Sequence, residues 1–120
     1  MATRELEVMV RQREGVAIVD LVGDVDASAE AALQRGYEEA AAGGGPVVLN
    51  FARADYINST GIALIVGLLA QARARDVQIT ACGLSDHYRE IFEITRLSDF
   101  MTIADNEDGA VGGAERSNHA

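Results

Sequence analysis

The fold of this chain is decided by one stretch, VVLNFARADYINSTGIALIVGLLAQARAR, residues 47–75. Val47 to Phe51 is a short apolar run bounded by turn residues, which predicts a central strand. Ala52 to Tyr56 is expected to be a connecting loop. Asn58 is a favoured helix-capping residue, so a helix is predicted to start beside it at Ser59 and to run to about Arg75. A strand, a loop and a helix in this order are typical of an α/β fold.

Two strands and one helix are predicted before this stretch. Leu6 to Val10 alternates apolar and polar residues, the period of a half-buried strand, and a turn then leads to a second strand, Val16 to Val22. Gly23-Asp24-Val25-Asp26 is expected to break that strand, after which Asp26 or Ser28 caps a helix. The helix is expected to end at Gly43-Gly44-Gly45-Pro46 and to bury Ala29, Ala32, Leu33, Gly36, Tyr37 and Ala40.

Two more strands and a helix are predicted after residue 75. The strands are Val77 to Cys82 and Phe100 to Ile103, and the helix between them is capped by Ser85 and turns Tyr88, Ile91 and Phe92 inward. The order ββαβαβαβ predicts a single α/β domain over residues 1–104, with a mixed β-sheet flanked by helices. Residues 105–120, rich in acids, Gly and Ala, are expected to form a flexible tail.

The helix predicted from Ser59 to Arg75 has an unusual outer side. The stripe expected to face the sheet consists of Ile62, Ile65, Val66, Leu69 and Arg73. The side expected to point away holds small and apolar residues where a surface helix normally carries charge, namely Ala63, Leu64, Gly67 and Leu68. Such a surface suits contact with another protein, although a sheet edge, the tail or another helix covering it is an equally simple explanation.

Composition argues against several classes of protein. With 10 Arg and Lys against 19 Asp and Glu, the net charge of -9 repels a phosphate backbone, so no nucleic-acid partner is expected. Tyr56 to Ala72, the longest uncharged stretch, is too short and too polar to span a membrane. Cys82 is the single cysteine, and Met1 to Val10 lacks the apolar run of a signal peptide. We therefore expect a cytoplasmic protein without membrane insertion.

The sequence contains no recognisable catalytic, metal or cofactor set. Ser59 lacks the Gly-x-Ser-x-Gly context of a nucleophile, and only His87 and His119 are available as a base, so a hydrolase is a distant alternative. One cysteine and two distant histidines predict no metal site. Gly43-Gly44-Gly45 follows a helix and precedes a strand, the reverse of a phosphate-binding loop. We expect neither an enzyme nor a bound cofactor.

Ser59 occupies a position that suits phosphorylation. The first turn of a helix has unpaired backbone N–H groups and a partial positive charge, which stabilise a phosphate by roughly 0.3 to 1 kcal/mol. A phosphoserine would fit there without melting the helix. The alternative is that Asn58, Ser59 and Thr60 only supply capping groups, and Thr60 is also open as the acceptor.

Three segments of the chain resemble the signature of a known family. Residues 56–62, Tyr-Ile-Asn-Ser-Thr-Gly-Ile, look like the Asp-Ser-[Ser/Thr]-Gly-Leu motif of bacterial anti-sigma factor antagonists, which are STAS domain proteins. Gly23-Asp24-Val25-Asp26 resembles the Gly-Glu-Leu-Asp turn of this family, and residues 89–100 resemble its closing helix and final strand. The resemblance extends over about Leu6 to Ile103.

The resemblance implies a partner-switching protein. The unphosphorylated antagonist would bind an anti-sigma factor serine kinase, a histidine-kinase-like ATPase, and release the sigma factor that this kinase holds. Ser59 maps onto the phosphorylated serine of the family, and a PP2C-type phosphatase would restore the active form. Together with the helix face, the resemblance places partner-binding residues at Asp24, Asp26, Asn58, Ser59, Thr60, Gly61, Ala63, Leu64 and Gly67.

The chain departs from the family motif at one position. Asn58 stands where the family has Asp, which keeps the helix cap but removes a charge beside the acceptor. STAS domains that act as scaffolds, sensors or transport-system subunits also vary here. A non-switching STAS module is therefore the alternative function, and Asp26 is as well explained by capping as by partner contact.

Overall fold

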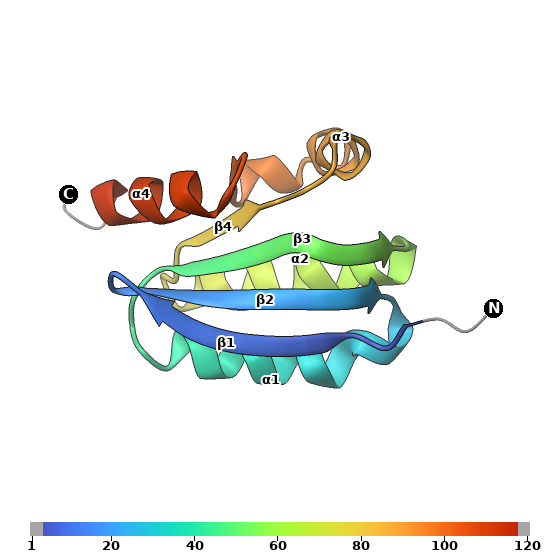
Figure 1. The fold of residues 1–120 in the computed structure, drawn as a ribbon, viewed down its shortest axis with the longest axis horizontal. Coiled ribbons are helices and arrows are strands. Elements are labelled where there is room, and N and C mark those ends of the chain that lie inside the picture. The colour runs from blue at the N-terminus through green and yellow to red at the C-terminus, as the bar shows by residue number, and fades with distance from the viewer. Residues whose placement is uncertain (1–3, 118–120) are drawn as a thin grey trace.

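The structure, a computed structural model, describes residues 4–117. Its five strands form one sheet in which the spatial order β1-β2-β3-β4-β5 equals the order along the chain (Figure 1). β1 (Glu7–Arg13) pairs with β2 (Val16–Val25) in antiparallel fashion. β2, β3 (Val47–Ile57), β4 (Ile79–Cys82) and β5 (Thr102–Ala104) run parallel. The predicted α/β fold and its ββαβαβαβ order are confirmed, and one further helix follows.

Helices cover both faces of the sheet. α1 (Glu30–Ala41) and α2 (Ser59–Ala74) lie behind β1 to β3 in Figure 1, and α3 (Asp86–Ile94) follows β4. These three helices share one core with alternate strand residues. α4 (Glu107–Ser117) packs on the other face. The two cores include Val19, Leu33, Leu49, Ile65 and Phe92 on the first face, and Val16, Ile18, Val48, Ala110 and Val111 on the second.

The predicted turns and caps are confirmed in several places. Glu14 and Gly15 both have positive φ, as a tight hairpin between twisted strands requires. α1 ends at Ala41, just before the glycine run. The Ser85 hydroxyl accepts a hydrogen bond from the Tyr88 N–H at 3.3 Å and so caps α3, as expected.

β2 and β3 are both longer than predicted. Gly23 to Val25 continues β2 rather than breaking it, and Ala52 to Ile57 continues β3 rather than forming a loop. The two strands stay paired because β3 accommodates one extra residue at each of two register shifts. At the first shift the Asn50 side chain accepts a hydrogen bond from the Ala52 N–H at 3.1 Å. The register shifts interrupt the regular alternation of buried and exposed residues. The sequence pattern therefore does not predict this part of β3.

Three further predictions are wrong. The buried side of α2 consists of Gly61, Ile65, Leu68, Leu69 and Ala72, whereas Val66 and Arg73 are exposed. The buried stripe is therefore rotated by about one residue from the predicted one. The expected tail is helix α4 over residues 107–117, and the final strand starts at Thr102 instead of Phe100. Residues 118–120, which include His119, lie outside the described part of the chain.

Candidate functional site

The first turn of α2 presents Ser59 and Thr60 to solvent. The cap of this helix is made by Asn58, whose side-chain oxygen accepts a hydrogen bond from the Gly61 N–H at 2.8 Å. Among the described residues, neither the Ser59 nor the Thr60 hydroxyl is used in a hydrogen bond. Asn58 thus caps the helix without their help, and both hydroxyls are accessible to another protein.

Contacts from two other elements fix the start of α2. The Asn58 N–H donates to the Val25 carbonyl at the end of β2 at 3.2 Å. The Tyr88 hydroxyl, from α3, accepts a hydrogen bond from the Ile57 N–H at 3.0 Å. The accessible hydroxyls therefore stand on a rigid support built from β2, β3 and α3.

Gly61 lets α2 approach β2 closely. A Cβ atom at this position would lie 2.0 Å from the Val25 carbonyl oxygen, far inside van der Waals contact. Gly61 is buried, so it shapes the site and offers no side chain to a partner. A glycine in the first turn of a helix, after a strong cap, is a sequence signal for such a close approach.

The outer side of α2 differs in part from the prediction. Ala63 and Gly67 are exposed as expected, Leu64 is half-buried, and Leu68 is buried in the core. Ala63, Leu64 and Gly67 line a groove of about 240 Å³ between α2 and α1. At this groove the side-chain amides of Gln34 and Gln71 join the two helices by two reciprocal hydrogen bonds of 2.8 Å.

Asp24 and Asp26 have structural partners within the chain. Asp24 is only 8% exposed, and its carboxylate accepts a hydrogen bond from the Arg4 N–H at 3.0 Å. Asp26 caps the 3-10 turn η1 (Ala27–Ala29), accepting from the Ser28 N–H at 2.9 Å and from the Ser28 hydroxyl at 2.6 Å. Capping thus accounts for Asp26, and Asp24 contributes little accessible surface for a partner.

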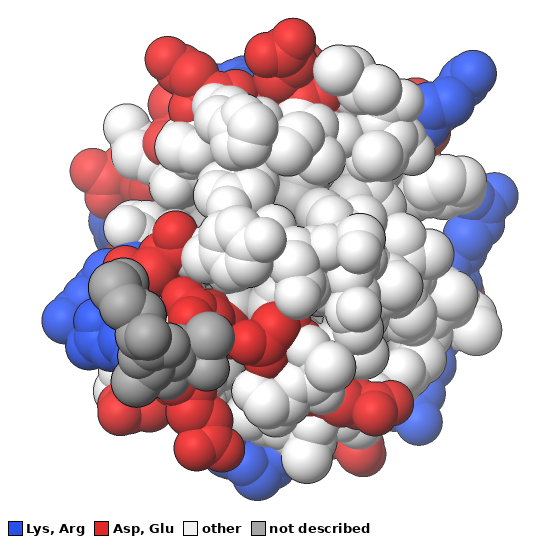
Figure 2. Space-filling view, turned by 90° about the vertical axis from the view of Figure 1, so that its right-hand side faces the viewer, with Lys and Arg blue, Asp and Glu red and all other residues white. Residues whose placement is uncertain are grey.

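The end of the molecule where β2 and β3 finish and α2 begins has a mostly uncharged centre. Figure 2 shows this end, with acidic side chains along its top, left and lower borders and basic side chains at its left and right edges. One exposed ion pair at 3.4 Å joins Arg4 to Asp55. An uncharged area of this kind is easier to desolvate against another protein than the acidic surface around it.

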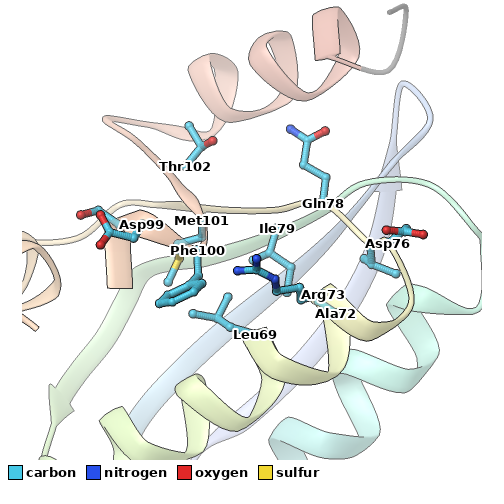
Figure 3. A pocket seen from close by; sticks show the side chains of 12 residues that line it. Leu69, Ala72, Arg73, Asp76, Gln78, Ile79, Asp99, Phe100, Met101 and Thr102 are labelled. Carbon is cyan, nitrogen blue, oxygen red and sulfur yellow. The ribbon is translucent and has the colours of Figure 1, made fainter. Parts of the chain in front are cut away.

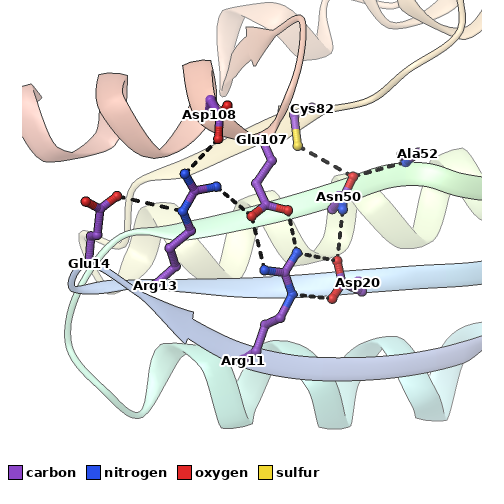
Figure 4. Close-up of polar contacts among 9 residues, drawn as sticks. All are labelled: Arg11, Arg13, Glu14, Asp20, Asn50, Ala52, Cys82, Glu107 and Asp108. Atoms are coloured by element: carbon purple, nitrogen blue, oxygen red, sulfur yellow. Dashed lines mark hydrogen bonds and ion pairs between the residues drawn. The ribbon is translucent and has the colours of Figure 1, made fainter.

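A polar cluster that sequence reasoning missed lies on the opposite face of the sheet. Arg11 donates to Asp20 at 2.6 Å and contacts Glu107 of α4, and Arg13 donates to Glu107 and Asp108 at 2.7 Å each (Figure 4). We call these five residues the ionic clasp. No sequence pattern signals the contacts of Arg11 and Arg13 with α4, because these partners lie more than 90 residues away in what was expected to be a tail.

The ionic clasp lowers the pKa of Glu107 and Asp20. Hydrogen bonds from Arg11 lower the pKa of Glu107 from 4.5 to about 2, against the effect of burial. Burial opposes ionisation of Asp20, but hydrogen bonds from Arg11 and Asn50 outweigh it and lower the Asp20 pKa. Burial raises the pKa of the neighbouring Cys82 thiol to about 11, which keeps it protonated and unreactive.

An open cavity of about 520 Å³ lies at the far end of α2 from Ser59 (Figure 3). Leu69, Ile79 and Met101 provide apolar walls, and the charged Arg73 and Asp99 also line the cavity. None of the predicted site residues lines it. Over residues 4–117 no cluster of three or more His, Cys, Asp or Glu side chains could hold a metal ion. In the same range no helix combines the length and apolarity needed to cross a bilayer.

Comparison with known proteins identifies the family. The STAS domain family matches residues 7–110, so the chain belongs to the STAS domain family. An anti-sigma-B factor antagonist of Listeria monocytogenes is 29% identical over 109 residues, 90% of this chain and 94% of that protein. BtrV of Bordetella bronchiseptica is 33% identical over 64 residues, which cover 53% of this chain and only 55% of BtrV.

Solved structures share the fold at low sequence identity. A sulfate transporter family protein from Wolinella succinogenes has a TM-score of 0.78 at 16% identity, covering 92% of this chain and 93% of that one. An anti-sigma factor antagonist from Mycobacterium paratuberculosis has a TM-score of 0.77 at 16% identity, covering 92% and 95%. The phosphorylated form of SpoIIAA from Bacillus has a TM-score of 0.66 at 20% identity, covering 88% and 97%.

Proposed function

We propose that this chain is an anti-sigma factor antagonist whose binding to an anti-sigma factor serine kinase is switched off by phosphorylation of Ser59. The observation that carries the proposal is the accessible Ser59 hydroxyl on a helix start that Asn58 caps and β2 and α3 hold in place. Relatives named as antagonists support the same function. In this proposal the chain is a binding protein and the catalysis belongs to its partners.

The proposed modification is chemically simple. The partner kinase, a histidine-kinase-like ATPase, transfers the γ-phosphoryl group of ATP to the Ser59 oxygen; the bond to the β-phosphate breaks, ADP leaves and the hydroxyl proton is released. A PP2C-type phosphatase hydrolyses the phosphoserine and returns the free hydroxyl. The N–H groups of the first turn of α2 stabilise the phosphate, so the helix persists in both forms.

Phosphorylation then acts on the interface rather than on the fold. The added charge of about -1.5 to -2 falls on the uncharged end of the molecule in Figure 2, where a partner must remove water to bind. Because the chain already carries a net charge of -9, the phosphate adds to its repulsion of an acidic partner surface. Asn58 is uncharged and adds no repulsion of its own against the phosphate.

Binding measurements on purified proteins test the proposal. The histidine-kinase-like ATPases encoded in the same genome are titrated one at a time, by calorimetry, with the unmodified chain and its variants. Ser59→Ala should bind one of them as the unmodified chain does, and Ser59→Asp should bind at least tenfold more weakly. Thr60→Asp tests the alternative acceptor on the same turn, and a larger loss of binding than that of Ser59→Asp would assign the switch to Thr60 instead. Equal binding by Ser59→Ala and Ser59→Asp would exclude the switch.

Phosphopeptide mass spectrometry identifies the acceptor directly. Trypsin releases residues 54–73 as one peptide, which contains both Ser59 and Thr60. Phosphate on Ser59 whose occupancy follows growth conditions is the expected result. A peptide unmodified under every condition would favour the alternative function, a non-switching STAS scaffold or transport-system subunit, for which the neutral Asn58 is the motivating observation.

A further inference from the structure

An apolar groove lies along α2, at the opposite end of this helix from Ser59. One wall consists of Val66, Leu69, Ala70 and Arg73 from α2, and the other of Thr95, Leu97 and Phe100. Arg96 has a left-handed backbone conformation, with φ of 65°, which reverses the chain after α3 and returns Phe100 to α2. We call this feature the α2 groove.

Large apolar side chains are exposed at the α2 groove. Val66 is 46% exposed and Phe100 57%, and Ile94, just before the groove wall, is also exposed. The α2 groove has a volume of about 260 Å³ and joins the cavity of Figure 3 through residues that line both. Clustered exposed apolar residues are a general mark of a protein interface.

Arg73 gives the α2 groove a charge preference. Its guanidinium lies 5.5 Å from the centre of the Phe100 ring, as Figure 3 illustrates, and among residues 4–114 it forms no ion pair. Asp99, the acid on the same segment as Phe100, is instead bound by Arg96 at 2.9 Å. Arg73 is therefore available to pair with a carboxylate that comes from outside the chain.

We propose that the α2 groove binds an amphipathic helix of a partner protein, which inserts an apolar side chain between Val66 and Phe100 and directs a carboxylate to Arg73. In helix-in-groove binding an amphipathic helix lays its apolar face into a hydrophobic groove, and Arg73 adds a charge that orients an acidic residue of that helix. The proposal rests on the proposed function in one respect: the helix belongs to the same protein that binds at Ser59. The exposed residues Ala63, Val66, Gly67 and Ala70 connect the two places along about 21 Å of helix.

Photo-crosslinking in the native cells identifies the occupant. The chain carries p-benzoylphenylalanine in place of Phe100, or in place of Ala63 near Ser59, and adducts are mapped by mass spectrometry. Both positions should capture the same protein, and the adduct at Phe100 should map to an amphipathic helical segment that contains an acidic residue. The proposal is overturned by no adduct at Phe100, by a different protein, by a second copy of this chain, or by a segment without an acid.

Paired substitutions measure the contribution of the α2 groove to affinity for the captured protein. Val66→Glu should weaken binding at least tenfold, and Met9→Glu, which alters an apolar residue of similar exposure on β1, should not. Arg73→Glu should weaken binding at least fivefold, whereas Arg75→Glu at the end of the same helix should leave it unchanged. Equal effects of test and control variants would refute a specific groove contact.

The two proposals fail in different ways. If phosphorylation of Ser59 switches off binding, Ser59→Asp should remove the adducts at both Phe100 and Ala63. Adducts that survive Ser59→Asp exclude the switch yet leave the α2 groove as a docking site. An adduct at Ala63 alone, lost in Ser59→Asp, supports the switch and overturns the groove.

Discussion

The two faces of the sheet are held in different ways. On the face of α1, α2 and α3, large side chains such as Leu33, Ile65 and Phe92 are fully or almost fully buried, and Phe92 packs edge-on against Phe51 with ring centres 5.6 Å apart. On the other face, α4 contributes mainly Ala110, Val111 and Ala114 and is joined to β1 by the ionic clasp. The difference indicates that large buried side chains hold the helices of the first face, whereas smaller apolar residues together with charge pairing hold α4 on the second.

The candidate site lies on the face that α1, α2 and α3 cover, so its geometry depends on the core that these helices share with the sheet. The start of α2 is held by hydrogen bonds to Val25 and Tyr88, and the ionic clasp takes no part in either bond. Loss of α4 attachment should therefore leave Ser59 in place. The following substitutions test this contrast, from the largest expected effect to the smallest.

Phe92→Ala should cost about 3 to 5 kcal/mol of unfolding free energy, since it empties a fully buried site that the neighbouring core cannot refill. Val111→Ala, which removes two carbon atoms from the α4 face, should cost only about 1.5 kcal/mol. Urea denaturation followed by circular dichroism measures both. Equal losses would contradict the proposed contrast between the faces.

Gly61→Ala should destabilise the chain by about 1 to 3 kcal/mol, because the new Cβ would overlap the Val25 carbonyl oxygen. Gly67→Ala is the matched control on the same helix. Its Cβ would meet no atom within 4 Å, and the lower backbone entropy of alanine should stabilise the helix by about 0.5 to 1 kcal/mol. Thermal unfolding of the two variants should shift in opposite directions.

Glu107→Gln should cost about 1 kcal/mol near neutral pH by removing charge from the ionic clasp. The Glu107 pKa is depressed to about 2 from 4.5, so its carboxylate stabilises the fold above about pH 4.5 and loses this effect as the pH falls toward 2. The stability difference between the unmodified chain and Glu107→Gln should narrow over that range. A difference independent of pH would contradict the assigned role of Glu107, and hydrogen exchange should locate the loss in residues 107–117.

Asn58→Asp should have the smallest effect, a gain of about 0.3 to 1 kcal/mol from a negative charge at the start of α2. The gain should shrink in concentrated salt, which screens this interaction. Denaturation at low and high ionic strength measures the change. A loss of stability would indicate that the Asn58 amide group has a role besides accepting from Gly61.

Much of the fold follows from local patterns in the sequence. The Asn58 and Ser85 caps, the end of α1 before its glycine run, and the turn at Glu14 and Gly15 each depend on residues within a few positions. The exposed Ser59 on the first turn of α2 was predictable for the same reason. Local chemistry determines where elements begin and end.

The errors arise where distant residues decide the structure. Ala52 to Ile57 lacks the alternation of apolar and polar residues that predicts a strand. It forms one because it pairs with β2, and this pairing accommodates the two extra residues of β3. Residues 107–117 have low helix propensity with three glycines, yet they form α4 because the sheet offers an apolar face and Arg11 and Arg13 offer partners. The buried side of α2 also differs from the prediction for a non-local reason, because Gly61 lets the start of the helix pack closely against Val25.

The strand order has a consequence for how this chain folds. Each strand pairs with the strand that precedes it in the sequence. During synthesis, every new strand can therefore pair with a strand that has already been made. The exception to this local assembly is the ionic clasp, in which Arg11 and Glu107 are separated by 96 positions. A chain emerging from the ribosome can therefore build its sheet progressively, and the contact between its first strand and α4 forms last.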